Sequence, residues 1–371
     1  MTTDTPIAGT CLPRFAAVRD AFAANFAERG DVGAALCLII DGETAVDLHG
    51  GWRDAGRAHA WRADTLVNLW STTKGVAAIC FAMLVDRGLM SYEDRVADHW
   101  SDFGFSGKSR ITIGQLLSHQ AGLCGFTTPA TIDDLLAGKA AAGRLAAQAP
   151  LWEPGTASGY HAISIGILAT ALFERIEGRS LKSFVRDEIV AGLKLDIAIG
   201  LDPCEDGRRA EIVASAELSS ADIGSLTPPQ VAALANPPLD PLLPNGPAWR
   251  AADLASANGH SNAAALAHLY AQFMGGLVRP ETLAAATAPR TGGVDLVLGL
   301  PARWAAGFLT NSDGLYGPNE AAFGHSGWGG SFGFADPVAN IAMSYTMNRM
   351  GTMLRDDPRD VALIEAVYRC L

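Results

Sequence analysis

The amino-acid sequence predicts an α+β fold, in which one antiparallel sheet is built from both ends of the chain and is flanked by helices. Apolar, β-rich runs occur before residue 50 and return after residue 300. The stretch between them is alanine-rich and mostly of helical pattern. With 371 residues, 49% of them hydrophobic, the chain can bury a large core.

This pattern predicts two intimately packed domains. Residues 1–90 and 291–371 are expected to form the sheet domain, and residues 91–290 a mostly helical inserted domain. A cleft between them is where a binding site would be expected.

The first elements are justified by periodicity and by stop signals. Residues 13–29 have the spacing of an amphipathic helix, which Gly30 ends. Two β-rich runs, 32–40 and 44–48, surround Asp41-Gly42, a pair typical of a hairpin turn.

The later elements follow from the same rules. A helix is expected to begin near Ser71 and to end at Gly88. Further helices are expected at 111–118, 131–148, 163–176, 181–192 and 263–274, with a proline-rich irregular connection at 226–247. Strands are expected at 305–309, 331–335 and 341–347, before a last helix at 359–370.

Composition excludes several classes of function. The formal net charge is −11 and no long basic run is present, which argues against nucleic acid and anionic membranes as partners. The six cysteines form no C-x-x-C pair, so neither a zinc site nor a disulfide framework is indicated. The first nine residues lack a signal-peptide pattern and the longest apolar run, 76–85, is too short to span a bilayer. A soluble, cytoplasmic protein is expected.

Ser71 and Lys74 carry the strongest chemical signal in the sequence. Three residues apart on a helix, they share one face, so the amine can reach the hydroxyl. A serine nucleophile needs a base, and lysine can serve if burial and the helix N-terminus lower its pKa. Taken alone, the pair proves little, because a helix cap followed by a solvated lysine has the same pattern.

Two further segments would complete such a site. Tyr160 lies on a loop before a helix and could relay a proton, although a half-buried structural tyrosine is the simpler interpretation. The glycine-rich segment 323–337 would let a substrate approach the backbone closely. A backbone N–H from that segment, together with the N–H of Ser71, would make an oxyanion hole. A glycine-rich hairpin without a substrate remains an open alternative.

In the order S-x-x-K, tyrosine, H-x-G, these segments resemble the serine β-lactamase and penicillin-binding-protein superfamily. The likeness spans about residues 30–350 and is greater to its class C-like branch, the family VIII carboxylesterases. It is carried further by Leu116-Leu117-Ser118-His119-Gln120-Ala121-Gly122-Leu123, by Pro154-Gly155-Thr156 and by Gly324-His325-Ser326-Gly327.

The resemblance implies the roles of the site residues. Ser71 matches the acylated nucleophile, Lys74 its base partner and Tyr160 the proton-shuttling tyrosine. The backbone amides of Ser71 and Trp328 match the oxyanion hole. Substrate contacts are expected from His325, Ser326, Gly327 and Trp152, and neither a metal nor an organic cofactor is implied.

Two departures from the family pattern affect the expected substrate. The tyrosine is followed by His161-Ala162, without the asparagine that would bind a β-lactam side chain. His325 stands where the third motif usually has lysine, and a neutral histidine attracts a carboxylate only weakly. Both changes favour small neutral esters over anionic β-lactams and D-Ala-D-Ala peptides.

The expected function is therefore hydrolysis of short-chain carboxylic esters through an acyl-enzyme. A β-lactamase or D-amino-acid peptidase, an acyltransferase and a non-catalytic acylated sensor remain alternatives. The Gly329–Gly333 segment fits the G-x-S-x-G elbow, but a strand follows it and no histidine comes after His325. His119 and His260 are expected to be structural. The natural ester stays open, and a homo-oligomer is possible.

Overall fold

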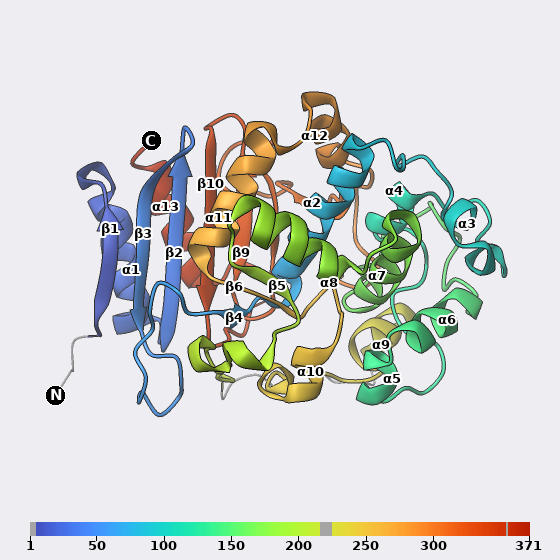
Figure 1. Cartoon of the computed structure of the whole chain (residues 1–371), viewed down its shortest axis with the longest axis horizontal. Coiled ribbons are helices and arrows are strands. Elements are labelled where there is room, and N and C mark those ends of the chain that lie inside the picture. Colours follow the sequence, from blue (N-terminus) through green and yellow to red (C-terminus); the bar gives the residue numbers. More distant parts are fainter. Residues whose placement is uncertain (1–4, 216–224, 354) are drawn as a thin grey trace.

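The computed structural model describes residues 5–215, 225–353 and 355–371. Its main sheet has seven antiparallel strands in the order β1-β3-β2-β10-β9-β8-β7 (Figure 1). The strands are β1 (Ile7–Cys11), β2 (Gly33–Ile40), β3 (Glu43–Gly51), β7 (Leu309–Thr310), β8 (Phe323–Ser326), β9 (Phe332–Asp336) and β10 (Ile341–Met347).

The two ends of the chain meet in the middle of this sheet. β2 pairs with β10 from Ala34 opposite Met347 to Ile40 opposite Ile341. Strands from before residue 52 and after residue 308 therefore form one hydrogen-bonded surface. The predicted fold class is confirmed, whereas the predicted domain boundaries remain a prediction.

Helices cover both faces of the sheet. In Figure 1, α11 (Ala263–Gln272) crosses in front of the strands, whereas α1 (Ala16–Glu28) and α13 (Pro358–Tyr368) lie behind them. Strand β2 shows why both faces need cover: Leu36 and Leu38 pack on the α1 and α13 side, and Cys37 packs on the other. The two-residue alternation of a strand therefore divides the core into two layers.

The remaining elements stand beside the sheet. A small sheet has the order β4-β6-β5. The other elements are β4 (Val67–Asn68), α2 (Thr73–Asp86), α3 (Val96–His99), α4 (Ile113–Leu117), α5 (Ile132–Leu136), α6 (Lys139–Ala147), α7 (Ser164–Glu177), α8 (Leu181–Phe184), β5 (Ile197–Ile199), α9 (Pro228–Leu234), α10 (Pro247–Ala251), β6 (Gly259–Ser261) and α12 (Pro280–Thr287).

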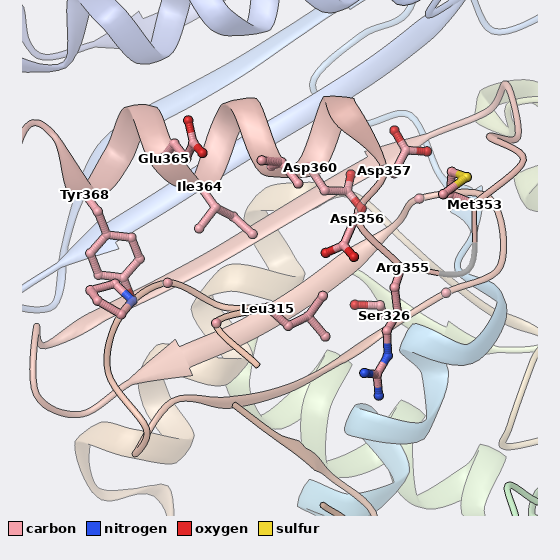
Figure 2. A pocket seen from close by; sticks show the side chains of 16 residues that line it. Leu315, Ser326, Met353, Arg355, Asp356, Asp357, Asp360, Ile364, Glu365 and Tyr368 are labelled. Atoms are coloured by element: carbon pink, nitrogen blue, oxygen red, sulfur yellow. The ribbon is translucent and has the colours of Figure 1, made fainter. Parts of the chain in front are cut away.

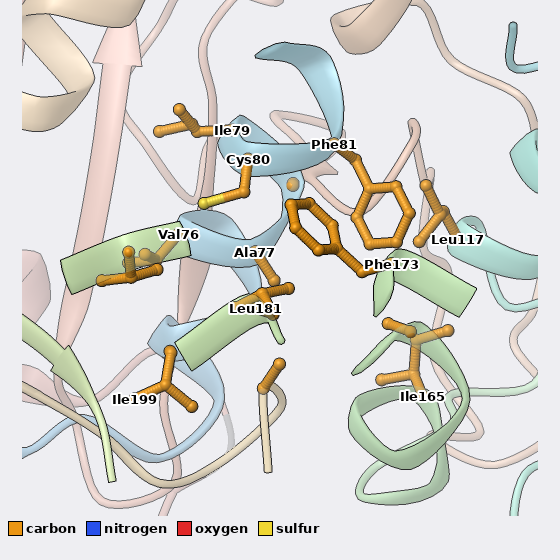
Figure 3. Packing of buried hydrophobic residues seen from close by; sticks show 14 of the residues in the cluster. Val76, Ala77, Ile79, Cys80, Phe81, Leu117, Ile165, Phe173, Leu181 and Ile199 are labelled. Atoms are coloured by element: carbon orange, nitrogen blue, oxygen red, sulfur yellow. The ribbon is translucent and has the colours of Figure 1, made fainter. Parts of the chain in front are cut away.

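Helix α2 runs through the core of the molecule. Every residue from Thr73 to Leu84 is buried. Figure 3 shows Phe81 of α2 beside Phe173 of α7, and their rings meet edge to face at 5.2 Å. A helix that is apolar on all sides can be stable only when other elements surround it. The side chains in the first turn of α2 are therefore held rigidly.

The structure corrects three of the predicted elements. The single helix expected at 131–148 breaks into α5 and α6 at Gly138, whose φ is 54°. The strand expected at 305–309 is limited to Leu309 onwards, because Ala305 N–H bonds Phe308 O across Gly307, whose φ is 89°. The connection at 226–247 contains α9 and α10 begins at its end, whereas β1 and the small sheet gave no clear sequence signal.

A buried ion network attaches α13 to the rest of the sheet domain. The Arg359 guanidinium donates to Asp31 at 2.8 Å and to Asp357 at 2.7 Å. It also donates to the carbonyls of Gly329 at 2.6 Å and of Arg349 at 2.8 Å. Arg359 is 2% exposed and Asp31 4%. One side chain thus fixes the helix, the chain before β2 and the glycine turn before β9.

We expect Arg359→Met to destabilise the fold strongly. The change keeps the volume but leaves two carboxylates buried without their cation, which typically costs about 3–5 kcal/mol of the free energy of unfolding. Urea unfolding followed by circular dichroism measures the loss. Arg369→Met, which removes an exposed pair with Glu365 at the end of the same helix, is the control and should change little. Equal stability of the two variants would contradict the structural role given to Arg359.

Candidate active site

Ser71 lies in a 3₁₀ turn, Trp70–Thr72, that leads into α2. The residue before it, Trp70, has a φ of 48°, a left-handed conformation that is uncommon for a bulky residue. Its ring is held by Trp249 at 5.2 Å and Trp328 at 4.9 Å between centroids. The neighbouring Thr72 bonds the carbonyl of Ser331 at 3.0 Å. Packing on both sides therefore maintains the unusual turn that presents the serine.

The structure brings Ser71, Lys74 and Tyr160 into direct contact. Lys74 Nζ lies 2.9 Å from Ser71 Oγ, and Tyr160 Oη donates to the same Oγ at 2.7 Å. Lysine and tyrosine thus approach one hydroxyl from two elements, because Tyr160 belongs to the loop before α7. A hydroxyl held between two proton-transfer groups has the arrangement that an activated nucleophile requires.

Lys74 is buried and has no ion-pair partner among the described residues. The residue is 4% exposed, and burial lowers its pKa well below the ordinary value. Its other partners are the carbonyl oxygens of Ala162 at 2.7 Å and Ser256 at 3.1 Å. A neutral amine has two N–H groups for these carbonyls and one lone pair for the Ser71 hydroxyl. The contacts therefore suit an uncharged base.

Tyr160 is held as a neutral phenol. Burial raises its pKa, and the negative charge of Asp295 acts in the same direction, whereas the hydrogen bond to Ser71 opposes them. The ring stacks on Trp304 with centroids 5.3 Å apart and planes 6° from parallel. Lys74 Nζ lies 4.8 Å from the centre of the Tyr160 ring. The phenol can therefore donate a proton to an atom at the Ser71 position.

His325, at the end of β8, is an uncharged side chain. Burial, with a smaller contribution from the neighbouring Lys74, lowers its pKa to about 3. Its Nδ1 lies 2.8 Å from the carbonyl oxygen of Ser326, so Nδ1 carries the proton and Nε2 is an acceptor. No permanent positive charge stands at the position where the sequence departs from the lysine pattern.

Ser326 and Gly327 have different surroundings. A Cβ on Gly327 would lie 2.3 Å from the carbonyl oxygen of Leu69, so only glycine fits beside the Ser71 turn. Ser326 Oγ instead lies 3.1 Å from Tyr316 Oη, at the edge of a cavity of about 400 Å³ (Figure 2). That cavity is bounded by α13, by the loop at 314–318, by Met353 and by residues 355–357.

The two predicted tryptophans also differ in their surroundings. Trp328 is half-buried and packs edge to face on Trp70, directly before the nucleophile. Trp152 donates from Nε1 to Ala157 O at 3.1 Å and packs against Gly159, in the loop that carries Tyr160. The structure therefore places Trp328 near Ser71, whereas Trp152 lies against the tyrosine loop.

Asp295 and Trp304 contact Tyr160, but the sequence analysis did not identify them as residues of the site. Asp295 is fully buried and accepts a hydrogen bond from Tyr160 N at 2.8 Å. No motif or spacing indicates this contact, because the partners lie 135 residues apart. His119, expected to be structural, accepts from His161 N through Nδ1 at 3.2 Å and packs edge to face on Tyr160.

The described residues contain neither a metal-binding cluster nor a disulfide. Over residues 5–215, 225–353 and 355–371, no group of three or more His, Cys, Asp or Glu side chains could hold a metal ion. All six cysteines belong to this described part, and each is free. None of the helices described is both long and apolar enough to cross a membrane.

The chain is similar to several known proteins in sequence and in fold. Residues 18–367 match the family model described as Beta-lactamase. The esterase/beta-lactamase LipL of Mycobacterium tuberculosis (strain ATCC 25618 / H37Rv) is 32% identical over 92% of this chain and 83% of its own. The crystal structure of a family VIII carboxylesterase matches with a TM-score of 0.93 and 44% identity, covering 99% of this chain and 100% of the other. A penicillin-binding-protein homologue from Caulobacter crescentus has a TM-score of 0.93 and 42% identity, with the same coverage.

We expect Lys74→Met to change how stability depends on pH. In the unfolded chain Lys74 titrates near its ordinary pKa of about 10.4, whereas in the fold its pKa is lower. Between the two values the unfolded state binds the extra proton, so the stability of the wild type gains from this residue as pH rises.

Chemical unfolding at pH 7, 8 and 9 compares the two proteins. The free energy of unfolding of the wild type minus that of Lys74→Met should increase with pH, because all other titrating groups are shared. If this difference in the free energy of unfolding stays constant with pH, the pKa of Lys74 is not lowered in the folded protein.

Proposed function

The chain belongs to the Beta-lactamase family, and from this premise we propose that it is a serine carboxylesterase that cleaves short-chain esters through an acyl-enzyme. The observation that carries the proposal is the contact of Ser71 Oγ with both Lys74 Nζ at 2.9 Å and Tyr160 Oη at 2.7 Å. The family VIII carboxylesterase with 44% identity supports the choice of esters.

Acylation begins with the uncharged Lys74 amine. It takes the Ser71 proton as Oγ attacks the ester carbonyl carbon and the carbonyl electrons move to oxygen. The backbone N–H groups of Ser71 and Trp328 are proposed to stabilise that oxyanion. As the carbonyl re-forms, the bond to the alkoxide breaks and Tyr160 gives it a proton, which the Lys74 ammonium replaces. The alcohol leaves and Ser71 carries the acyl group.

Deacylation uses the same groups in the reverse order. Water takes the place of the alcohol and loses a proton to the Tyr160 and Lys74 pair as it attacks the acyl carbon. The second oxyanion collapses and expels Ser71 Oγ, which regains its proton. The carboxylic acid departs, and each group returns to its starting protonation state. The cycle as proposed needs no metal or organic cofactor.

The proposed substrate is a neutral ester. His325 is uncharged because its pKa is about 3, and Lys74 is uncharged in the resting state as proposed. A carboxylate on the substrate would therefore find no permanent cation at either position. Ala162 stands where a β-lactam's amide side chain would need an asparagine. His325, Gly327 and Trp328 are proposed to line the path to Ser71.

A β-lactamase activity is the second candidate, because the LipL relative is named an esterase/beta-lactamase. Its fold and nucleophile would be the same. The uncharged His325 disfavours it, since the substrates of β-lactamases carry a carboxylate. An acyltransferase, in which another alcohol replaces water, and an acylated sensor, in which deacylation fails, would share the first half of the cycle.

We expect Ser71→Ala to lower kcat/KM for p-nitrophenyl butyrate by about 10³-fold or more, because the acyl-enzyme can no longer form. Intact-protein mass spectrometry after an acid quench should show one added butyryl group on the wild type and none on the variant. Ser331→Ala, which removes the competing serine of the G-x-S-x-G segment, should still be acylated. Full esterase activity in Ser71→Ala would refute the proposal. A stable adduct without turnover would identify a sensor.

We expect neutral esters to be preferred to anionic ones. The specificity constant for p-nitrophenyl butyrate should exceed that for a chromogenic cephalosporin by at least about 10²-fold, the range that a few missing polar contacts produce. The two substrates are compared on one enzyme preparation, with Ser71→Ala as the blank for both. A cephalosporin rate that rivals the ester rate would make β-lactam hydrolysis the main activity.

A further inference from the structure

A buried carboxylate lies beneath the loop that carries Tyr160. Asp295 is fully buried, and its Oδ1 accepts from Tyr160 N at 2.8 Å, Val297 N at 3.0 Å and Leu298 N at 3.0 Å. Its Oδ2 accepts from Trp304 Nε1 at 3.0 Å. All four partners are N–H donors, which suits an ionised carboxylate. The loop at 293–302 and the tyrosine loop are thus joined at one side chain.

The partner on Oδ2 fixes the ring of Tyr160. Trp304 is 2% exposed and stacks on that ring, nearly parallel, with centroids 5.3 Å apart. The ring of His119 packs edge to face against both rings, with its centroid 4.5 Å from that of Trp304 and 5.1 Å from that of Tyr160. The hydrogen bond from Nε1 to Asp295 sets the rotation of the indole, and the indole covers one face of the phenol. Asp295 therefore holds Tyr160 twice, through its backbone and through its ring.

We propose that Asp295 is a positioning residue that, acting through Trp304 and the backbone N–H of Tyr160, holds the phenol in line with Ser71 Oγ. The inference rests on the proposed function, since it concerns the group that transfers protons there. The hydrogen bond of 2.7 Å between Tyr160 and Ser71 depends on the ring position. A displacement on the order of 1 Å at a proton-transfer group can cost about 10²-fold in rate.

Charge adds a second effect of the same residue. The Asp295 carboxylate disfavours a tyrosinate and so raises the pKa of Tyr160, after burial as the main cause. Removing that charge should move the pKa of Tyr160 down, and the basic limb of the pH–kcat profile with it. The other titratable groups around the phenol are Lys74, His119, His161, Tyr316 and His325. Of these, the buried His161 also feels the Asp295 charge, which raises its pKa, so the variant should lower the pKa of His161 further and leave that ring neutral.

The test is Asp295→Asn alone and combined with Trp304→Phe. An asparagine oxygen can keep the three backbone donors, but its amide N–H then faces Trp304 Nε1–H. We expect kcat per folded molecule to fall about 10- to 100-fold with little change in KM, and the basic limb to shift to lower pH. Trp304→Phe keeps a ring and removes the opposing donor, so the double variant should recover part of the lost kcat.

Asp336 provides a matched control. It is also fully buried, its Oδ1 accepts from Val338 N at 2.9 Å and Ala339 N at 3.2 Å, and its Oδ2 accepts from Asn319 at 2.7 Å and Tyr368 at 2.5 Å. Its partners lie outside the Ser71, Lys74 and Tyr160 site. Asp336→Asn should lose stability, as Asp295→Asn does, yet keep the kcat and the pH profile of the wild type. Thermal unfolding gives the folded fraction of every variant.

The outcomes separate a positioning role from a structural one. If Asp295→Asn behaves as Asp336→Asn does, or if the double variant recovers nothing, the inference is wrong. If Asp295→Asn does not fold, the single variant Trp304→Phe tests the inference instead. A lower kcat with no downward shift of the basic limb of the pH–kcat profile supports the inference. A wild-type kcat overturns it. Full activity in Ser71→Ala would instead refute the proposed function itself.

Discussion

The burial of the Lys74 amine, which has no ion-pair partner in the described part of the chain, is the constraint on which the rest of the structure depends. Burial lowers its pKa, and among the described residues its hydrogen-bond partners are two carbonyl oxygens and one hydroxyl. Such a group weakens the fold at neutral pH, because the unfolded chain keeps the proton that the folded chain gives up. The surrounding core must offset this cost. Helix α2, which is buried from Thr73 to Leu84, and the network of Arg359 are two of the contributions that do so.

The site is assembled from segments that lie far apart along the chain. Ser71 and Lys74 come from a strained turn and the helix behind it, Tyr160 from a loop before α7, and His325 from the end of β8. Contacts between distant segments bring them together, as when Tyr160 Oη donates to Ser71 Oγ across 89 residues of sequence. Precision therefore comes from the tertiary structure, and proton transfer over distances of 2.7–2.9 Å requires it.

What the sequence could predict depends on how local each signal is. The contact of Ser71 with Lys74 can be predicted because residues three apart on a helix lie on the same face. Tyr160 and His325 could be predicted as site residues only from the order of their motifs along the chain. The contact of Asp295 with Tyr160 spans 135 residues, and an isolated aspartate gives no sign of such a partner. The break at Gly138 and the turn at Gly307 were missed because a glycine inside an apolar run does not reveal whether its φ is positive.

The pairing of β2 with β10 has a consequence for how the protein is made. A sheet whose central strands come from opposite ends of the chain has a high contact order, and it closes only after the last strand has left the ribosome. His325, which helps to enclose the amine, also emerges late. Until then Lys74 remains hydrated and protonated, and Ser71 is an ordinary serine. The proposed activation of Ser71 therefore requires the completed fold and is absent from the nascent chain.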